Sequence, residues 1–261
     1  MTAAVPARTI GPSVGVGRPP GRPAGVGVSH VRVHSSQAPD GQCGGTPHVH
    51  LVCTEMYVAL EGSGAAEFLT PAGFERVELR PHTAVTFAPG TLHRLVPDPG
   101  RDLTILVIME NGHLNEQGDV VFVFPPEDLA DARRYEALAT AAGPAAVLAR
   151  RDRAVTGFTA LVSAWQQDPD QGRAALLSFY DRAAALVRPR AAGWPDLVAH
   201  GPARAVQRLA ERASAAAAGD PAHLADAALT RLTTPGTVPH RAGFCGDVHT
   251  YRPASVGAPT T

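Results

Sequence analysis

Apolar and polar residues alternate along the chain from about residue 28 to residue 110, which is the period of two expected for half-buried β-strands. Val31 and Val33 begin this pattern, with polar residues on either side of each. Turn-forming segments such as 71–73 and 97–100 separate runs rich in β-branched and aromatic residues. Many short strands at this spacing predict a β-sandwich or a small β-barrel. The expected later strands are 49–52, 55–60, 65–69, 74–79, 84–88, 93–96 and 103–109.

The hydrophobic period changes to about 3.6 residues beyond residue 125, which predicts amphipathic helices packed on a core. The clearest apolar stripe runs from Leu176 to Val187, and a later helix is expected to open at Gly201-Pro202. In that later helix the arginines should face solvent, and the face expected to turn inward carries Val206, Leu209, Ala210 and Ala213. We interpret these stripes as core rather than as a cofactor-binding surface.

Charge and composition exclude several classes of protein. The formal net charge of -1 and the isoelectric point near 6.8 give no electrostatic attraction to nucleic acid or to an anionic membrane. All 23 basic residues are arginine, so the chain cannot form a Schiff base through lysine. The 3 cysteines are too few and too scattered for a disulfide framework. No apolar run approaches the roughly 18 residues of a membrane span and no signal peptide is recognised, so a cytoplasmic location is the default expectation.

Three histidines and one glutamate in the β-rich half follow a spacing that suits a metal site. His48 and His50 are two residues apart, so on a strand both side chains point to the same side, whereas on a helix they would diverge. Glu55 follows after a short turn, and His93 comes just after the turn at Pro89-Gly90. Three imidazoles and one carboxylate form a ligand set for one divalent transition-metal ion. The histidine pair is a weak signal by itself, but the whole set is hard to explain by chance.

These residues resemble the cupin superfamily, whose first motif is G(x)5HxH(x)3-4E(x)6G and whose second is G(x)5PxGxxH(x)3N. Residues 48–62 match the first motif from its histidine pair to its final glycine. Its leading glycine is out of place, because Gly41 stands one residue too far and Gly44 is too near. The second motif is matched in part: Pro89-Gly90 and His93 are present, but the residue between proline and glycine and the closing asparagine are missing. None of these departures touches a ligand position.

The resemblance implies a mainly β fold, a cupin barrel (double-stranded β-helix, or jelly-roll) followed by an α-helical C-terminal region. We expect a disordered Gly- and Pro-rich tail over residues 1–27, the barrel over 28–112, the helical region over 113–239 and a separate C-terminal segment over 240–261. The resemblance also suggests a homodimer. The metal ligands that it implies are His48, His50, Glu55 and His93.

Two further groups could act near the metal. Tyr57 lies two residues after Glu55 and should point inward, either as a general acid or hydrogen-bond donor to substrate or as barrel filling. The C-terminal segment is rich in reactive side chains, and in an extended conformation Cys245, Asp247 and His249 share one face. It forms either an ordinary surface strand or a cover that folds back over the barrel. The sequence leaves both pairs of alternatives open.

The ligand set permits several reactions, because four protein ligands leave two positions of a six-coordinate ion for small molecules. With Fe(II), which we favour, the site permits dioxygenation, whereas Mn, Ni, Co or Zn permits Lewis-acid chemistry. The first hypothesis is a dioxygenase-type oxidoreductase that acts on a small oxygenated metabolite. The second is a metal-dependent isomerase or epimerase of a sugar-like or keto acid substrate. The third is a non-catalytic protein that binds a small molecule or a metal.

Overall fold

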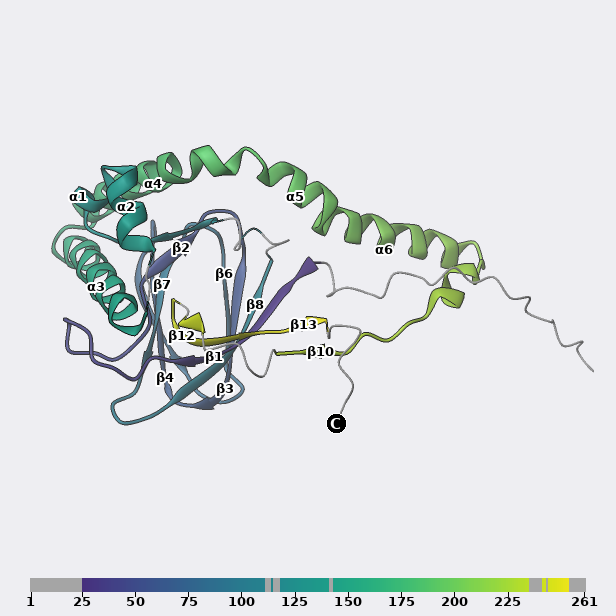
Figure 1. The fold of residues 1–261 in the computed structure, drawn as a ribbon, viewed down its shortest axis with the longest axis horizontal. Coiled ribbons are helices and arrows are strands. Elements are labelled where there is room, and N and C mark those ends of the chain that lie inside the picture. Colours follow the sequence, from purple (N-terminus) through teal and green to yellow (C-terminus); the bar gives the residue numbers. More distant parts are fainter. Residues whose placement is uncertain are drawn as a thin grey trace, which may run out of the picture.

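The computed structural model of this chain describes residues 25–110, 114, 118–140, 143–234, 241–242 and 244–253. The tail expected over 1–27 lies outside the described residues except for 25–27. Two antiparallel β-sheets face one another as a jelly-roll, and helices cover one side of it (Figure 1). The predicted fold class, a mainly β barrel followed by a helical region, is therefore confirmed.

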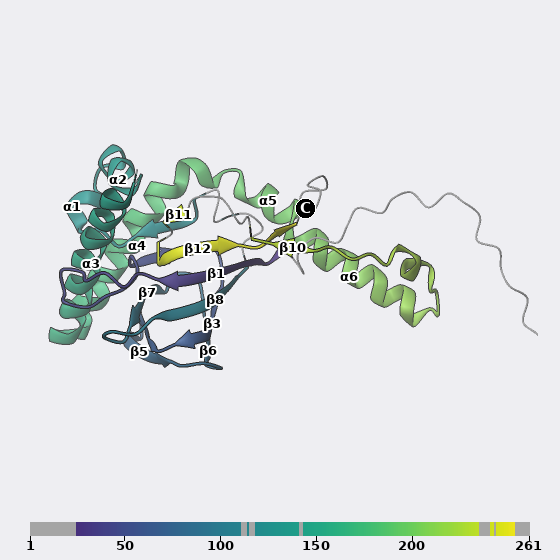
Figure 2. The ribbon, with the colours of Figure 1, turned by 60° about the horizontal axis from the view of Figure 1, so that its bottom comes forward.

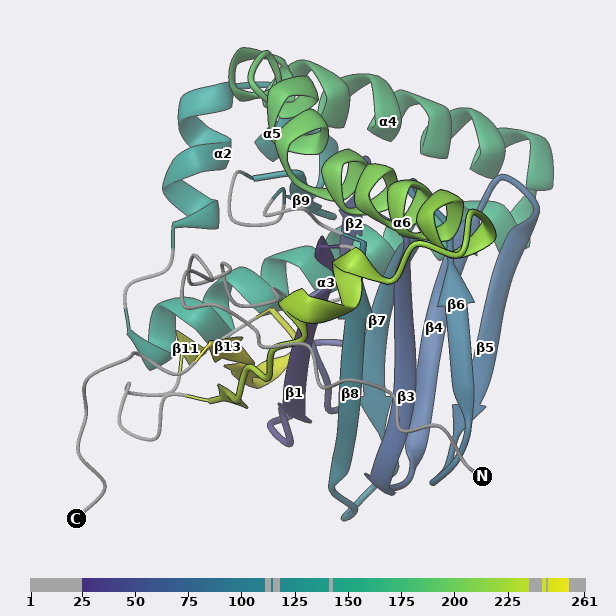
Figure 3. The same ribbon diagram turned by 90° about the vertical axis from the view of Figure 1, so that its right-hand side faces the viewer.

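Six strands make up the first sheet and five make up the second. In spatial order the first sheet consists of β11 (Arg241–Ala242), β12 (Gly246–Thr250), β1 (Gly27–Val33), β8 (Leu103–Met109), β3 (Glu55–Gly62) and β6 (Ala84–Phe87). The second consists of β5 (Gly73–Leu79), β4 (Gly64–Thr70), β7 (Leu92–Pro97), β2 (His48–His50) and β9 (Val120–Phe122). Figure 3 shows β8 and β3 between β1 and β6. Most successive strands alternate between the two sheets, which is the connectivity of a jelly-roll.

The predicted period of two is visible in the burial of β3. Glu55, Tyr57 and Ala59 are buried between the sheets, whereas the residues between them are only half-buried. The chain turns from β3 into β4 at Gly62, where φ is 80° and an added Cβ would lie 1.8 Å from the Asp102 carbonyl oxygen. Only glycine fits this turn. The sequence Glu61-Gly62-Ser63-Gly64 is typical of a β-hairpin, but β3 and β4 do not pair, because the chain passes here from the first sheet to the second. The other apolar side chains buried between the sheets include Val31, Val33, Ala66, Phe68, Leu79, Leu95, Leu103 and Ile105.

The helical region follows the second sheet, and its first four helices form a layer on the outer face of that sheet. The members of the region are α1 (Pro126–Leu129), α2 (Ala132–Ala139), α3 (Pro144–Gln167), α4 (Pro169–Ala191), α5 (Trp194–His200), α6 (Pro202–Ala217) and the 3-10 helix η3 (Ala222–Asp226). None of these helices is long and apolar enough to cross a membrane, as far as the described residues go. A two-stranded ribbon of β10 (Leu232–Thr233) and β13 (Arg252–Pro253) completes the described elements.

The helices α3 and α4 share a second core with the barrel rather than standing apart from it. Val49, which lies between the two histidines of β2, points away from them into this core. There it belongs to one apolar cluster with Phe158 of α3 and Phe179 of α4. At Gly157 of α3 an added Cβ would lie 2.2 Å from the Val123 carbonyl oxygen, so the helix backbone touches the segment that follows β9. The barrel was expected to end at residue 112, but β9 belongs to its second sheet, so the sheet continues past that residue and contacts the helices.

The last long helix, α6, corrects one expectation. Val206 and Leu209 were expected to face the interior, but they are 61% and 65% exposed. None of the described residues of α6 is buried, and the helix runs away from the two sheets (Figure 1). The amphipathic pattern identifies which side of a helix is apolar, but it does not determine whether the chain covers that side.

Candidate metal centre

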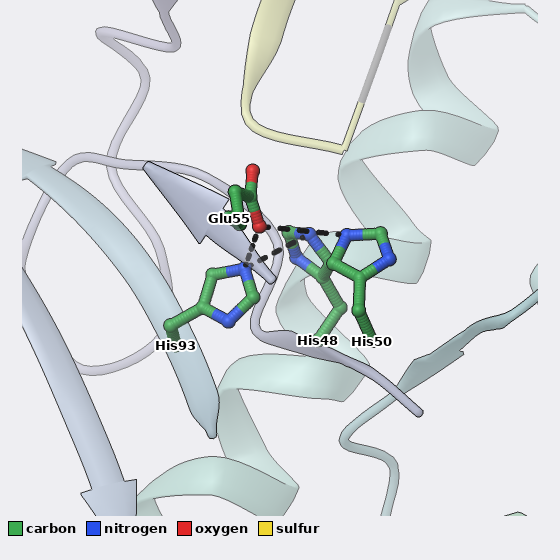
Figure 4. Close-up of side chains that lie close together, drawn as sticks. All are labelled: His48, His50, Glu55 and His93. Carbon is green, nitrogen blue, oxygen red and sulfur yellow. Dashed lines mark hydrogen bonds and ion pairs between the residues drawn. The ribbon is translucent and has the colours of Figure 1, made fainter. Parts of the chain in front are cut away.

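The four predicted ligands come together at one end of the space between the sheets. His48 and His50 lie on β2, Glu55 begins β3, and His93 lies on β7 directly opposite His48 in the antiparallel pairing. Figure 4 shows the side chains pointing toward one another from these three strands. All four are buried. The pairing of β2 with β7 explains how residues distant in sequence meet.

The spacing of the donor atoms fits one ion. The Nε2 atoms of His93 and His48 are 3.2 Å apart, and the Glu55 Oε2 atom lies 3.3 Å from Nε2 of His93. The same Oε2 atom lies 3.6 Å from Nε2 of His50, and all four donor atoms lie within 4.8 Å of one another. Donors bound side by side to one transition-metal ion at about 2.1 Å lie about 3 Å apart. Oε2 of Glu55 is buried and has no hydrogen-bond partner in the described part of the chain, which fits the lone pair of a metal ligand.

Each histidine is oriented by a hydrogen bond at its other ring nitrogen. Nδ1 of His48 lies 2.8 Å from the carbonyl oxygen of Thr46, and Nδ1 of His93 lies 2.9 Å from that of Thr91. A carbonyl oxygen only accepts, so Nδ1 carries the proton and Nε2 presents its lone pair to the centre. Such contacts fix the tautomer and the ring direction of metal-binding histidines.

The third histidine is held by a residue that the sequence analysis missed. Oδ1 of Asp119 lies 3.0 Å from Nδ1 of His50, and Asp119 is 0% exposed. The backbone carbonyl of Asp119 accepts a hydrogen bond of 3.1 Å from Leu51 N, which fixes it beside β2. No local spacing links an aspartate to a histidine 69 residues earlier. The one available signal was an acidic residue placed directly before the apolar run 120–124.

Burial and neighbouring charges set the protonation of these groups. Burial lowers the pKa of His48 well below its usual range, and the neighbouring His93 and His50 lower it further. Burial also opposes the charged form of His50, but Asp119 and Glu55 outweigh it, so the pKa of His50 is raised. For Asp119, burial favours the neutral acid, yet the hydrogen bond and charge of His50 lower its pKa. Asp119 therefore stays ionised, and His48 stays neutral and able to coordinate.

A cavity of about 90 Å³ is lined by three of the four donor residues, His48, His50 and Glu55. It has room for a few water molecules or a ligand of few heavy atoms. Tyr57 lines it and is almost fully buried, with its ring 6.0 Å from that of His93. Burial and the negative charge of Glu55 raise the pKa of Tyr57 well above its usual range. The inward position expected for Tyr57 is thus observed, and its hydroxyl keeps its proton.

The C-terminal segment also reaches the cavity. β12 pairs with β1 (Figure 2), and the Phe244 carbonyl accepts a hydrogen bond of 2.6 Å from Thr46 N. An added Cβ at Gly45 would lie 2.8 Å from Cα of Cys245, so glycine permits this close passage. The residues of the segment that line the cavity are Phe244, Cys245, Val248 and Thr250.

This arrangement differs from the single face expected for the segment. Among the described residues, Asp247 and His249 do not line the cavity, whereas Val248 does. The alternation is broken at Gly246, where φ is 159° and an added Cβ would lie 1.9 Å from the Arg32 carbonyl oxygen. A close backbone approach at a glycine therefore accompanies a change of face, and the side of β12 that lines the cavity carries Val248 and Thr250.

Comparison with known proteins yields similar folds at low identity. No family model matches the chain, and no curated protein matches it. A cupin protein from Bacteroides fragilis is similar over 32% of this chain and 62% of its own, with 20% identity and a TM-score of 0.25. A recombinant oxalate oxidase in complex with glycolate is similar over 49% of this chain and 63% of its own (16% identity, TM-score 0.33). A TDP-fucose-3,4-ketoisomerase from Campylobacter jejuni is similar over 31% and 58% (13% identity, TM-score 0.27).

Each of these matches spans less than two thirds of the other protein, so none of them carries an activity to this chain. The assignment of the fold rests on the chain itself. Residues 48–62 carry the first motif, two antiparallel sheets face one another, and three histidines and one glutamate meet between them. The barrel of this chain has the cupin fold.

Proposed function

We propose that the chain binds one divalent transition-metal ion through His48, His50, Glu55 and His93. We propose further that the iron(II) form is a dioxygenase-type oxidoreductase that acts on a small oxygenated metabolite. The observation that carries the proposal is the convergence of four buried donor atoms within 4.8 Å, with every histidine held at Nδ1. A transition-metal ion held there would supply Lewis acidity and, if it is iron(II), electron transfer to dioxygen.

The residues around the cavity would bind and orient the substrate. Tyr57 presents a buried hydroxyl beside Glu55 and Cys245 that keeps its proton and has no well-formed hydrogen bond within the described residues, so it can donate to a substrate oxygen. Val107, Met109 and Phe244 give the cavity apolar walls that limit the entry of water. The size of the cavity favours a small substrate.

The protonation of the cavity groups favours oxygen chemistry over isomerisation. An isomerase that moves protons needs a base whose pKa lies near the working pH. Apart from the four donor residues, the described titratable groups that line the cavity are Tyr57 and Cys245, and burial raises the pKa of both. The hydroxyls of Ser29 and Thr250 hydrogen-bond to each other at 3.2 Å. None of these four groups is a base at neutral pH.

Oxygen consumption tests the proposal. Full-length protein is loaded anaerobically with iron(II) and mixed with small hydroxy and keto acids, and oxygen uptake is recorded with an electrode. We expect uptake that depends on both iron and substrate in the wild type and is lost in His50→Ala. The exposed His200→Ala variant serves as a matched control and should keep the activity. Tight zinc or manganese without oxygen uptake would favour the isomerase, and substoichiometric metal without turnover would favour the binding protein.

A further inference from the structure

Arg150 of α3 is a buried cation with no carboxylate partner among the described residues. It is 7% exposed, and its Nη1 donates to the Ala139 carbonyl oxygen at 3.2 Å. Its Nε and Nη2 atoms are buried and have no hydrogen-bond acceptor within the part of the chain that the structure describes. Arg94, another buried arginine, differs: its Nε pairs with Glu67 and its Nη2 pairs with Asp40.

The two unpaired nitrogen atoms of Arg150 lie on the same side of its guanidinium. Nε and Nη2 form one edge of the guanidinium, and this is an edge that binds a carboxylate through two parallel hydrogen bonds. A guanidinium stays protonated in proteins, and a buried charge without a counter-ion is costly. The rings of Phe122 and Phe244, whose centroids lie 4.7 and 5.5 Å from Cζ, offset part of this cost through cation-π contacts. They leave the hydrogen-bonding edge unsatisfied.

Arg150 lies next to the wall of the metal cavity. Phe244 lines that cavity, and its ring centroid is 5.3 Å from that of His48 and 5.5 Å from Cζ of Arg150. One aromatic side chain therefore contacts both a predicted metal ligand and the buried guanidinium. Among the described residues that line the cavity, none is an arginine or a lysine. Arg150 is thus the residue that could favour a negatively charged ligand over a neutral one where the ligand enters beside Phe244.

We propose that a small ligand entering the cavity displaces the ring of Phe244 and places its carboxylate on the Nε–Nη2 edge of Arg150, which lies behind that ring and does not itself line the cavity. The substrate is therefore a carboxylic acid. This inference rests on the proposed function, because it takes the cavity as the substrate site. Arg150 acts as a specificity-determining residue that holds the carboxylate while the remainder of the ligand lies toward the metal donors. Phe122, the other ring in contact with the guanidinium, holds it in place for this interaction.

Propionate and propionamide are suitable probes because they have nearly the same shape and differ in charge. Both are titrated into full-length protein, metal-free and zinc-loaded, and affinities are taken from NMR shifts of the protein. We expect wild type to bind propionate roughly 10- to 100-fold more tightly than propionamide, as for charge-assisted hydrogen bonds. Arg150→Met should lose this preference while its affinity for propionamide stays unchanged. Arg173→Met removes an arginine that stacks on Trp165 of α3 and should keep the preference.

Several results would overturn the proposal. One is an equal affinity of wild type for both probes, and another is an unchanged preference in Arg150→Met. If Arg150→Met does not fold, Arg150→Lys keeps the charge but not the two-atom edge, and we expect it to bind propionate several-fold more weakly. Unchanged affinity in Arg150→Lys would contradict the proposal. If zinc-loaded protein preferred propionate to propionamide but metal-free protein did not, the carboxylate would bind the metal and not Arg150. If the protein took up no metal, only the proposed function would be refuted.

Discussion

Replacing Asp119 by asparagine tests how the metal donors are held. The Asp119 carboxylate is 3.0 Å from Nδ1 of His50 and fully buried, so solvent does not screen the contact. Partners of this kind typically contribute 10- to 100-fold to metal affinity. At about 1.36 kcal/mol per tenfold, Asp119→Asn should weaken binding by roughly 1.4–2.7 kcal/mol. The asparagine side chain is similar in size, so the loss reports the charge and not a cavity.

The size of this loss should depend on pH in a defined direction. In the wild type Asp119 raises the pKa of His50, so protons compete with the metal at this histidine as the pH falls through the raised value. Asp119→Asn removes that effect and lets burial lower the pKa of His50. The difference in affinity should therefore be largest above the raised pKa and should narrow toward lower pH.

Competition with a chelating dye between pH 6 and pH 8 measures these affinities. Asp128→Asn is a matched control, because Asp128 is also 0% exposed but pairs with Arg134 and Arg153 on the helices. Both variants should lose stability, and only Asp119→Asn should lose metal affinity. Wild-type affinity of a folded Asp119→Asn at pH 8, or an equal loss in Asp128→Asn, would refute the reasoning.

Three further predictions concern single groups. Tyr57→Phe removes one buried hydroxyl, so metal content and melting temperature should be retained while the turnover of iron-loaded protein falls; unchanged turnover would make Tyr57 barrel filling. Gly157→Ala places a Cβ 2.2 Å from the Val123 carbonyl oxygen and should lower the free energy of unfolding, measured with urea, by about 1–3 kcal/mol. In the control Gly193→Ala the added Cβ meets nothing within 4 Å, and the free energy of unfolding should change by less than about 0.5 kcal/mol. Bound metal should be lost progressively below roughly pH 5 to 6 as histidines protonate, and full occupancy at pH 4 would count against three imidazole ligands.

The sequence predicted the barrel and the candidate ligands because both depend on local spacing. A period of two fixes which side of a strand is buried, so His48 and His50 had to share one side and Val49 the other. The histidine pair, the glutamate and the turn before His93 are each recognisable within a few residues.

Features that depend on contacts between distant segments could not be read in this way. Asp119 meets His50 only because β9 pairs with β2, and nothing in the local sequence specifies that pairing. The homodimer suggested by the resemblance stays a prediction, which light scattering of purified protein would test. The exposure of Val206 was missed for a similar reason. A periodic apolar pattern shows which side of a helix could be buried, but it does not show which other segment, if any, packs against that side.

Metal content of full-length protein purified without added metal tests the central claim most directly. We predict about one transition-metal ion per chain in the wild type and in the exposed-histidine control His200→Ala, and close to none in His48→Ala. The claim would be contradicted if the folded His48→Ala variant kept the metal content of the wild type, or if wild type took up no ion even when iron(II), zinc and manganese were supplied.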